Sequence, residues 1–240
     1  MGLPNSPPTS PGNFEFEALR WARNYRAALV REFAPFLSGD LIEIGAGIGQ
    51  VTELLARLPG VRQVLAVEPD SRLCEQFRQR LPEQPVFQGT VAGLGQGTAC
   101  DAVVSTNVLE HIEEDLRELS AYARLLSERR GVLCLFVPAR QEIYAPLDRD
   151  FGHFRRYSKA GLAEKLRRAG FEIVRLRYFN SFGYFGWWFS FCLLGKRSFD
   201  VAAVRLFDRM VFPVVYWLES RIAYPPIGQS LLAVARVARD

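Results

Sequence analysis

The stretch LIEIGAGIGQ (residues 41–50) joins a short apolar run to three glycines that alternate with other small or apolar residues. The run at residues 41–44 is typical of a strand, and residues 51–58 are predicted to form a helix. Glycines between the two let the backbone turn tightly and approach a ligand with no Cβ in the way. The stretch therefore predicts a ligand-binding turn between a buried strand and a helix.

Short apolar runs and amphipathic segments alternate on both sides of this turn. Strands are predicted at residues 41–44, 64–67, 86–87, 102–105, 132–137, 171–178 and 230–237. Helices are predicted at residues 14–37, 51–58, 71–81, 113–127 and 159–169, the last one flanked by the capping residues Ser158 and Gly170. Nearly all-apolar strands that alternate with helices indicate a parallel sheet covered on both faces. We therefore predict an α/β fold with a doubly wound, mostly parallel seven-stranded sheet.

The chain of 240 residues is predicted to form one α/β domain with a tail and an insertion. Residues 1–13 are predicted to be a disordered tail, because residues 2–12 contain four prolines and no apolar run. The domain takes residues 14–179 and 230–240. Residues 180–229, which the sheet does not require, are predicted to form an aromatic-rich helical insertion or lid before the last strand.

Two carboxylates accompany the glycine turn. Glu43 lies two residues before the first glycine, and Glu68 ends the next strand, 21 residues after Gly47. A carboxylate at the second position can accept two hydrogen bonds from a ribose diol. The first would repel a pyrophosphate, and Gln50 stands where a dinucleotide site places its third glycine. The pattern favours a ligand with a ribose and a cationic end, with a nicotinamide-dependent oxidoreductase as the second interpretation.

Four motifs together resemble the class I S-adenosylmethionine-dependent methyltransferases of the bacterial small-molecule type. They are EIGAGIG (43–49), VEPD (67–70), STNVLEHI (105–112) and FGHFRRYS (151–158). The resemblance covers roughly residues 14–180 and the last strand. It implies a Rossmann-like fold, S-adenosyl-L-methionine as the cofactor and a methyltransferase activity. A non-catalytic domain that keeps the cofactor pocket is a third interpretation.

The resemblance also implies where the cofactor binds. Glu43 would lie near its methionyl end, and Glu68 would bind the ribose hydroxyls. The residues expected to bind the cofactor are Tyr25, Glu43, Gly45, Ala46, Gly47, Gly49, Glu68, Pro69, Gly89, Thr90, Val91, Asn107 and Val108. The family often has an acidic residue near the adenine amine after the third strand, where this chain reads QGTV (88–91). Adenine contacts are therefore expected from the backbone or from Thr90.

His111, in the loop after the fourth strand, is the candidate catalytic residue. A neutral imidazole there can remove a proton from the acceptor, and lining of the pocket is the alternative role. The residues expected to contact the substrate are Tyr144, His153, Arg155 and Tyr157. For Arg155, pairing with Asp148 or Asp150 is the alternative. No metal site is predicted, because the four cysteines lie far apart with no C-x-x-C pair and the chain has only two histidines.

Charge and aromatic content bear on the acceptor. Residues 151–240 hold 15 Lys+Arg and 6 Asp+Glu, yet the loop after the fourth strand lacks an aromatic platform for a flipped base, so nucleic acid is not expected as a partner. Residues 178–195 carry no charge, and nine of these 18 residues are aromatic. This composition favours a small or lipid-like acceptor, which we expect to be methylated at oxygen.

The aromatic segment also bears on location. Two membrane spans would be needed to return the chain to its sheet, and the charges at residues 205–209 would be costly in lipid. Residues 180–218 are therefore expected to touch a membrane surface without crossing it, or to form a lid that packs on the core or within a homodimer. Scattered cysteines and the absence of an apolar run in residues 2–12 favour a cytoplasmic protein, peripheral at the inner membrane surface in the first case.

Overall fold

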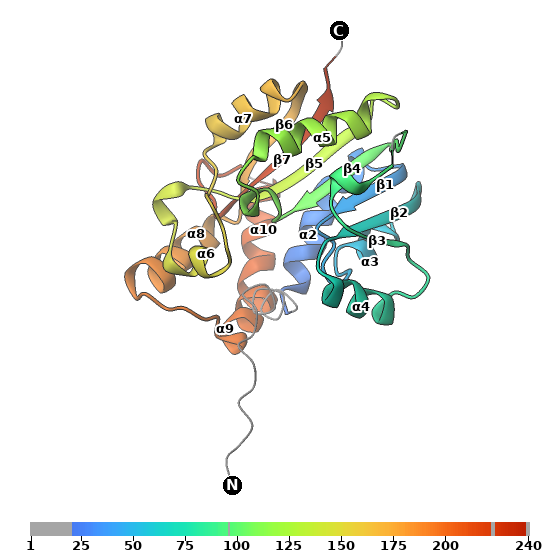
Figure 1. The fold of residues 1–240 in the computed structure, drawn as a ribbon. Helices are drawn as coiled ribbons and strands as arrows, with labels where there is room; N and C mark the ends of the chain where they lie inside the picture. Colours follow the sequence, from blue (N-terminus) through green and yellow to red (C-terminus); the bar gives the residue numbers. More distant parts are fainter. Residues whose placement is uncertain (1–20, 96, 222–223, 239–240) are drawn as a thin grey trace.

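The computed structural model describes residues 21–95, 97–221 and 224–238, and a seven-stranded sheet forms its centre (Figure 1). The strands are β1 Gly39–Ile44, β2 Val61–Glu68, β3 Val86–Gln88, β4 Ala102–Thr106, β5 Val132–Pro138, β6 Phe171–Phe179 and β7 Ser230–Val237. Their order is β3-β2-β1-β4-β5-β7-β6, and only β7 runs antiparallel to its neighbours. The predicted doubly wound, mostly parallel sheet is confirmed.

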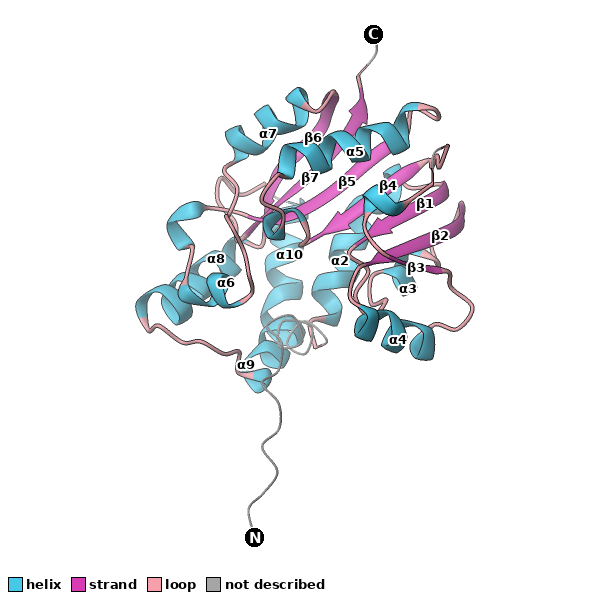
Figure 2. Ribbon diagram, in the orientation of Figure 1, coloured by secondary structure: helices cyan, strands magenta, loops and turns pink. Residues whose placement is uncertain are grey.

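Helices connect the strands and form the segment before β7 (Figure 2). In the described ranges the α-helices are α2 Arg23–Phe33, α3 Thr52–Leu55, α4 Ser71–Arg80, α5 Asp115–Ser127, α6 Pro146–Asp150, α7 Lys159–Arg168, α8 Ser181–Trp187, α9 Val201–Leu206 and α10 Phe212–Arg221. The shorter turns are 3₁₀ at Ala34–Phe36, Val91–Gly93, Leu109–His111 and Gln141–Ile143, and π-helical at Trp188–Leu193 and Phe207–Val211. The Ser158 side chain caps α7 by accepting a hydrogen bond from the Gly161 amide, as predicted.

Two helices are shorter than the sequence pattern predicts. The helix predicted over residues 14–37 is α2 in its described part, which starts at Arg23 and gives way to a 3₁₀ turn that contains Pro35. The helix predicted over residues 51–58 is regular only in α3, and Pro59 follows directly after its predicted end. A proline disfavours helical geometry in the residue before it. Residues 1–13, predicted as a tail, lie outside the described residues.

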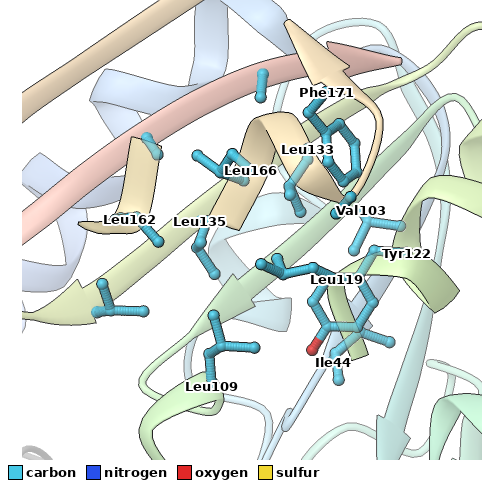
Figure 3. Close-up of a cluster of buried hydrophobic side chains, with 14 of the residues drawn as sticks. Ile44, Val103, Leu109, Leu119, Tyr122, Leu133, Leu135, Leu162, Leu166 and Phe171 are labelled. Carbon is cyan, nitrogen blue, oxygen red and sulfur yellow. The ribbon is translucent and has the colours of Figure 1, made fainter. Parts of the chain in front are cut away.

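The sheet is the middle of three layers, because side chains along a strand point to opposite faces. On one face Ile44 packs with Leu119 of α5 and Leu166 of α7 (Figure 3). On the other face Leu41 packs with Phe33 of α2. Glu43 stands between Leu41 and the glycine turn, so it shares the face that α2 covers.

The insertion packs into the helical layer that contains α2. Phe212 of α10 is buried in the same cluster as the inner face of α2, and α10 lies beside α2 (Figure 1). The Asp208 carboxylate accepts hydrogen bonds from the backbone N–H groups of Asn24 and Tyr25, 3.0 and 2.9 Å away. These bonds satisfy amide groups that the start of a helix otherwise leaves without partners. The insertion therefore holds the first turn of α2 in place.

The outer side of the insertion is strongly apolar. Its exposed large apolar side chains are Phe182, Phe185, Trp188, Phe189, Leu193, Leu194, Val201, Leu206, Met210, Val214, Trp217 and Leu218. Within residues 21–95, 97–221 and 224–238, no helix combines the length and the hydropathy that a bilayer crossing requires.

Candidate functional site

The carboxyl ends of β1, β2 and β4 meet where the strand order reverses, which is where open α/β sheets bind ligands. The glycine turn leaves β1 at this point. Gly45 and Gly47 have φ values of +72° and +55°, in the left-handed region that favours glycine. A Cβ on Gly45 would overlap the Val108 side chain in the loop after β4. The Val108 side chain therefore lies directly against the glycine turn.

Glu68, at the end of β2, is bound to this turn. Its Oε2 accepts a hydrogen bond from the backbone N–H of Gly47 at 2.8 Å, and its Oε1 accepts one from the N–H of Asp70 at 2.9 Å. Burial raises the pKa of Glu68, and these two backbone bonds counteract part of the rise. Each carboxylate oxygen has two lone pairs, so the fixed carboxylate retains acceptor capacity toward a ligand.

Glu43, inside β1, is almost completely buried. Its Oε2 accepts a hydrogen bond from the hydroxyl of Thr52 at the start of α3. Burial raises the pKa of Glu43 to about 8, the Thr52 bond opposes this rise, and the charge of Glu68 adds to it. A positively charged ligand beside this group would stabilise its ionised form.

Two adjoining pockets that share Gly45, Asn107 and His111 follow these loops, and together they are called here the strand-end cleft. Its turn side is lined by side chains and backbone that include Tyr25, Arg26, Glu43, Gly45, Ala46, Thr106, Asn107, His111 and Phe136. Its β3 side is lined by residues that include Gly45, Glu68, Pro69, Gly89, Thr90, Val91, Asn107, Val108, His111 and Glu118. The structure thus brings together eleven of the thirteen residues expected at the cofactor. Gly47 and Gly49 shape the turn instead, through the Glu68 bond and through packing against Phe77.

A second space, called here the aromatic cavity, adjoins the strand-end cleft under the insertion. It is lined by residues that include Tyr25, Asn107, Glu110, Phe151, His153, Arg156, Trp187, Phe199 and Phe207. Tyr25 also lines the turn side of the cleft, and Asn107 lines both sides of it. Asn107, with a φ of +53°, therefore stands where the cleft and the cavity meet.

His111 is half-buried and lines both sides of the strand-end cleft. Its ring meets the ring of His153 edge to face, with 4.6 Å between the centroids. Burial, and secondarily the neighbouring His153, lower the pKa of His111 to about 4. The imidazole is therefore neutral at physiological pH, the form that can accept a proton or bind a metal.

The cluster predicted to contact the substrate divides into two groups. His153 lines the aromatic cavity. Tyr144 lines neither the cavity nor the cleft, and its hydroxyl donates a hydrogen bond to the His153 carbonyl oxygen at 2.6 Å. Arg155 and Tyr157 line neither the cavity nor the cleft, because both bind Asp115 at the start of α5, at 2.8 and 2.9 Å. The structure therefore places these two residues in a brace between the loop and α5.

Arg155 pairs with neither Asp148 nor Asp150, the alternative partners expected from the sequence. The buried Arg156 binds Asp148, and Arg197 binds Asp150. Nε of Arg156 donates to Oδ1 of Asp148 at 2.8 Å, and Nδ1 of His153 lies 2.9 Å from the same oxygen. Burial works to raise the pKa of Asp148, but the hydrogen bond with His153 and the charge and hydrogen bond of Arg156 bring it below its ordinary value. Residues 155–157 precede a bridge to Ala139, and neighbours in extended backbone point to opposite sides. This alternation turns Arg156 to one side of the segment, toward Asp148, and Arg155 and Tyr157 to the other side, toward Asp115.

Several lining residues were missed from the sequence. Glu118 of α5 reaches the β3 side of the cleft, and Glu110 and Arg156 reach the aromatic cavity. Glu110 lies beside His111 in a recognised motif, which was a usable signal. No sequence signal pointed to Glu118. It lies one turn into α5, and the pattern of that segment indicates only an amphipathic helix.

Comparisons with known proteins agree with this geometry. A family model described as a methyltransferase domain matches residues 18–176. A protein of Mycobacterium tuberculosis strain H37Rv, named a probable S-adenosylmethionine-dependent methyltransferase, is 30% identical over 159 residues, which are 65% of this chain and 57% of that protein. Trans-aconitate 2-methyltransferase of Afipia carboxidovorans is 28% identical over 125 residues, 52% of this chain and 47% of that enzyme. The chain thus spans about half the length of these curated relatives.

Solved structures share the fold at lower sequence identity. An S-adenosylmethionine-dependent methyltransferase of Archaeoglobus fulgidus has a TM-score of 0.60 at 17% identity and covers 92% of this chain and 97% of its own. One from Clostridium acetobutylicum has a TM-score of 0.59 at 10% identity and covers 94% and 97%. The likeness covers nearly the whole chain.

Proposed function

The chain belongs to the methyltransferase domain family of S-adenosylmethionine-dependent proteins, and from this premise we propose that it moves a methyl group to a hydroxyl oxygen of a small or lipid-like acceptor. The observation that carries the proposal is the junction at Asn107. There the strand-end cleft, with two carboxylates, adjoins a cavity with aromatic walls, and Asn107 lines both spaces. A polar donor and an apolar acceptor can meet at this point without crossing bulk water.

The residues of the strand-end cleft fit S-adenosylmethionine. Glu68 keeps acceptor capacity for the two ribose hydroxyls, and Thr90 and Val91 border the space where adenine would lie. Glu43 supplies a buried carboxyl group on the turn side, which suits the cationic methionyl end. The same group would repel the pyrophosphate of a nicotinamide dinucleotide, so that alternative is not favoured.

The chemistry assigns a limited task to the protein. S-adenosylmethionine supplies a methyl group that the sulfonium already activates. Tyr25 and Asn107 line both the cleft and the cavity. These two residues therefore flank the path along which donor and acceptor approach each other. Such positioning contributes about 7–11 kcal/mol in favourable cases. His111, beside this path, is proposed to promote loss of the hydroxyl proton as the oxygen–methyl bond forms.

The aromatic cavity supports an apolar acceptor. Phe151, Trp187, Phe199 and Phe207 form much of its wall, and Arg156 and His153 give it a polar end. One curated relative is named for a small molecule, trans-aconitate, which supports an acceptor of small size. A nucleic acid is not proposed, because the cavity lies under the insertion and its walls are mainly apolar.

The outer side of the insertion supports contact with a membrane. Exposed aromatic and aliphatic side chains of α8, α9 and α10 alternate with exposed cations, among them Lys196, Arg197, Arg205 and Arg209. Helices that pair an apolar face with basic residues lie in the plane of an anionic bilayer surface. We place the protein in the cytoplasm with this side against the inner membrane surface, where a lipid-like acceptor can enter the cavity that the same insertion lines.

Calorimetry followed by a transfer assay tests this function. S-adenosylmethionine and S-adenosylhomocysteine should bind the purified chain, and NAD should not. Methyl-labelled S-adenosylmethionine, offered with lipid extracts and with water-soluble metabolites, should label the lipid-extractable fraction. Binding of NAD in place of S-adenosylmethionine would overturn the cofactor. Cofactor binding with no label in either fraction would favour a non-catalytic domain.

A further inference from the structure

Two loops bring Glu110, His111 and His153 together at the boundary between the cleft and the cavity. One ligating atom from each of the three side chains lies within 4.8 Å of the other two. Glu110 and His111 belong to the 3₁₀ turn after β4, and His153 belongs to the loop after α6. Glu110 and His153 are buried, while His111 is half-buried. The sequence predicted no metal site, and 42 positions separate the two histidines that the fold brings together.

Hydrogen bonds to neighbouring residues 148–152 hold both imidazole rings in place. Nδ1 of His153 lies 2.9 Å from Oδ1 of the buried Asp148, so Nε2 is the ring nitrogen on the opposite side. His111 has backbone hydrogen bonds with Phe151 and Gly152. Histidines that bind metals characteristically make such a bond from the other ring nitrogen to a carboxylate or a backbone carbonyl, which fixes the ring.

The charges around the cluster also suit a cation. Glu110 contributes a carboxyl group whose oxygens lie inside the protein, and Asp148 is a second acidic group behind His153. Arg156 is the nearest cation in this group of contacts, and its Nε is bound to Asp148, which offsets its charge. The net charge of the ionised acidic groups and Arg156 is therefore −1.

The position of the cluster connects it to the proposed reaction. Glu110 and His153 line the aromatic cavity, whereas His111 lines the strand-end cleft. A cation held by all three would have protein ligands on one side and open coordination positions toward the acceptor. Two imidazoles and one carboxylate are ligands typical of Mn²⁺, Fe²⁺ and Zn²⁺ rather than Mg²⁺ or Ca²⁺.

We propose that Glu110, His111 and His153 bind one divalent transition-metal cation, which coordinates the acceptor hydroxyl during methyl transfer. The inference rests on the proposed function and specifies how His111 promotes proton loss. Coordination lowers the pKa of the hydroxyl, and its proton leaves to water. An oxygen electron pair then forms the bond to the methyl carbon, while the carbon–sulfur pair stays on sulfur and yields S-adenosylhomocysteine. The cation keeps its oxidation state throughout.

Metal binding is tested on the full chain after dialysis against a chelator. Titration with Mn²⁺, followed by electron paramagnetic resonance, should show one bound ion per chain that Zn²⁺ displaces and Mg²⁺ does not. Spin-echo modulation of the bound Mn²⁺ should show two imidazole nitrogens in the wild-type protein, a readout that needs no variant to fold. Absence of bound Mn²⁺ and Zn²⁺, or a bound ion without imidazole modulation, would overturn the site.

Matched variants locate the site. Glu110→Gln and His153→Gln should each weaken Mn²⁺ binding by about tenfold or more. Glu113→Gln, which changes an exposed carboxylate three residues away, should leave it unchanged. Equal Mn²⁺ affinity in all three variants, with thermal unfolding showing that each is folded, would refute the assignment.

The transfer assay separates this inference from the proposed function. Methyl transfer should fall in chelator-treated protein and return on addition of Mn²⁺ or Zn²⁺. Full activity without metal would overturn the role of the cation but not the proposed methyltransferase function, and His111 would then act as a direct base. Metal binding at the cluster with no methyl transfer to any acceptor fraction would overturn the proposed function and the cation's part in it.

Discussion

The Glu68 carboxylate accepts a hydrogen bond from the Gly47 amide, 2.8 Å away, between the end of β2 and the turn that leaves β1. The contact joins two of the sequence motifs that lie 21 residues apart. The Glu68 carboxylate, which is the proposed acceptor for the ribose hydroxyls, therefore also positions the turn. A change at Glu68 should therefore affect both the ligand and the turn.

Glu68→Ala should weaken S-adenosylmethionine binding by about 1–3 kcal/mol, or roughly 5- to 150-fold, because hydrogen bonds to a charged acceptor are lost. Titration calorimetry measures this change. Glu75→Ala, an exposed carboxylate on α4, is the matched control and should bind normally. An affinity for the Glu68 variant equal to that of wild type would remove this residue from the ribose site.

Gly45→Ala should reduce S-adenosylmethionine affinity by about tenfold or more, since a side chain in the left-handed region is strained. Its Cβ would also overlap Val108. The double variant Gly45→Ala/Val108→Ala removes the overlap and should recover part of the affinity. Gly170→Ala has a φ of +86° with no atom near the added Cβ, and it controls for backbone strain alone. No recovery in the double variant would show that the two loops do not need this approach.

The affinity for S-adenosylmethionine should rise with pH up to about 8. Below the pKa of Glu43, which burial raises to about 8, the empty protein holds a proton on this group. A cationic ligand favours the ionised form, so binding releases that proton and is helped by higher pH. Calorimetry in buffers of different ionisation enthalpy measures the proton count.

Two comparisons sharpen the pH experiment. S-adenosylhomocysteine lacks the sulfonium charge and should show a weaker pH dependence than S-adenosylmethionine. Glu43→Gln should remove the difference between the two ligands. A pH profile that is the same in wild type and in the Glu43 variant would assign the proton to another group.

The exposed side of the insertion should bind vesicles that contain anionic lipid, as measured by flotation. Trp188→Ser/Phe189→Ser should reduce the floating fraction, because these side chains are 45% and 52% exposed. Phe154→Ser removes an equally exposed ring, 52%, outside the insertion and should float like wild type. High salt should weaken binding if the surrounding cations contribute.

Other outcomes of the flotation experiment have distinct meanings. If wild type stays in solution and sedimentation shows a dimer that the double variant disrupts, the apolar side is an interface between two copies. If wild type stays in solution as a monomer, the membrane role fails. Extraction that requires detergent at high salt would contradict the view that the segment does not cross the bilayer.

The sheet was predictable because its strands carry local signals. β7 was predicted with its observed bounds around the apolar run at residues 231–235, and a run buried on both faces is typical of a central strand. The antiparallel placement of β7 between β5 and β6 was not part of that signal. The direction of a strand depends on the segment that connects it to the strand before it. Between β6 and β7 that segment is the long insertion, whose path has no local signal in the sequence.

The site was predictable only where its parts are local. Gly45, Glu43 and Asn107 lie in motifs at strand ends, and all three line the strand-end cleft. The pairing of Asp148 with Arg156 rather than Arg155 depended on the alternation of an extended segment, a signal that was present but not used. The approach of His153 to Glu110 joins loops far apart in sequence, and no local pattern encodes such a contact.

The hydrogen bonds from Asn24 and Tyr25 to Asp208 couple the insertion to the start of α2, which contributes Tyr25 to the site. Tyr25 lines both the cleft and the cavity, so displacing the insertion releases the backbone that places this ring. A ligand in the cleft and a ligand in the cavity thus both need the Tyr25 ring in this position. A molecule that stabilises the position from one side assists binding on the other. Linkage makes this assistance mutual. A surface that binds the insertion would consequently act on the strand-end cleft through Tyr25, although it touches no atom there.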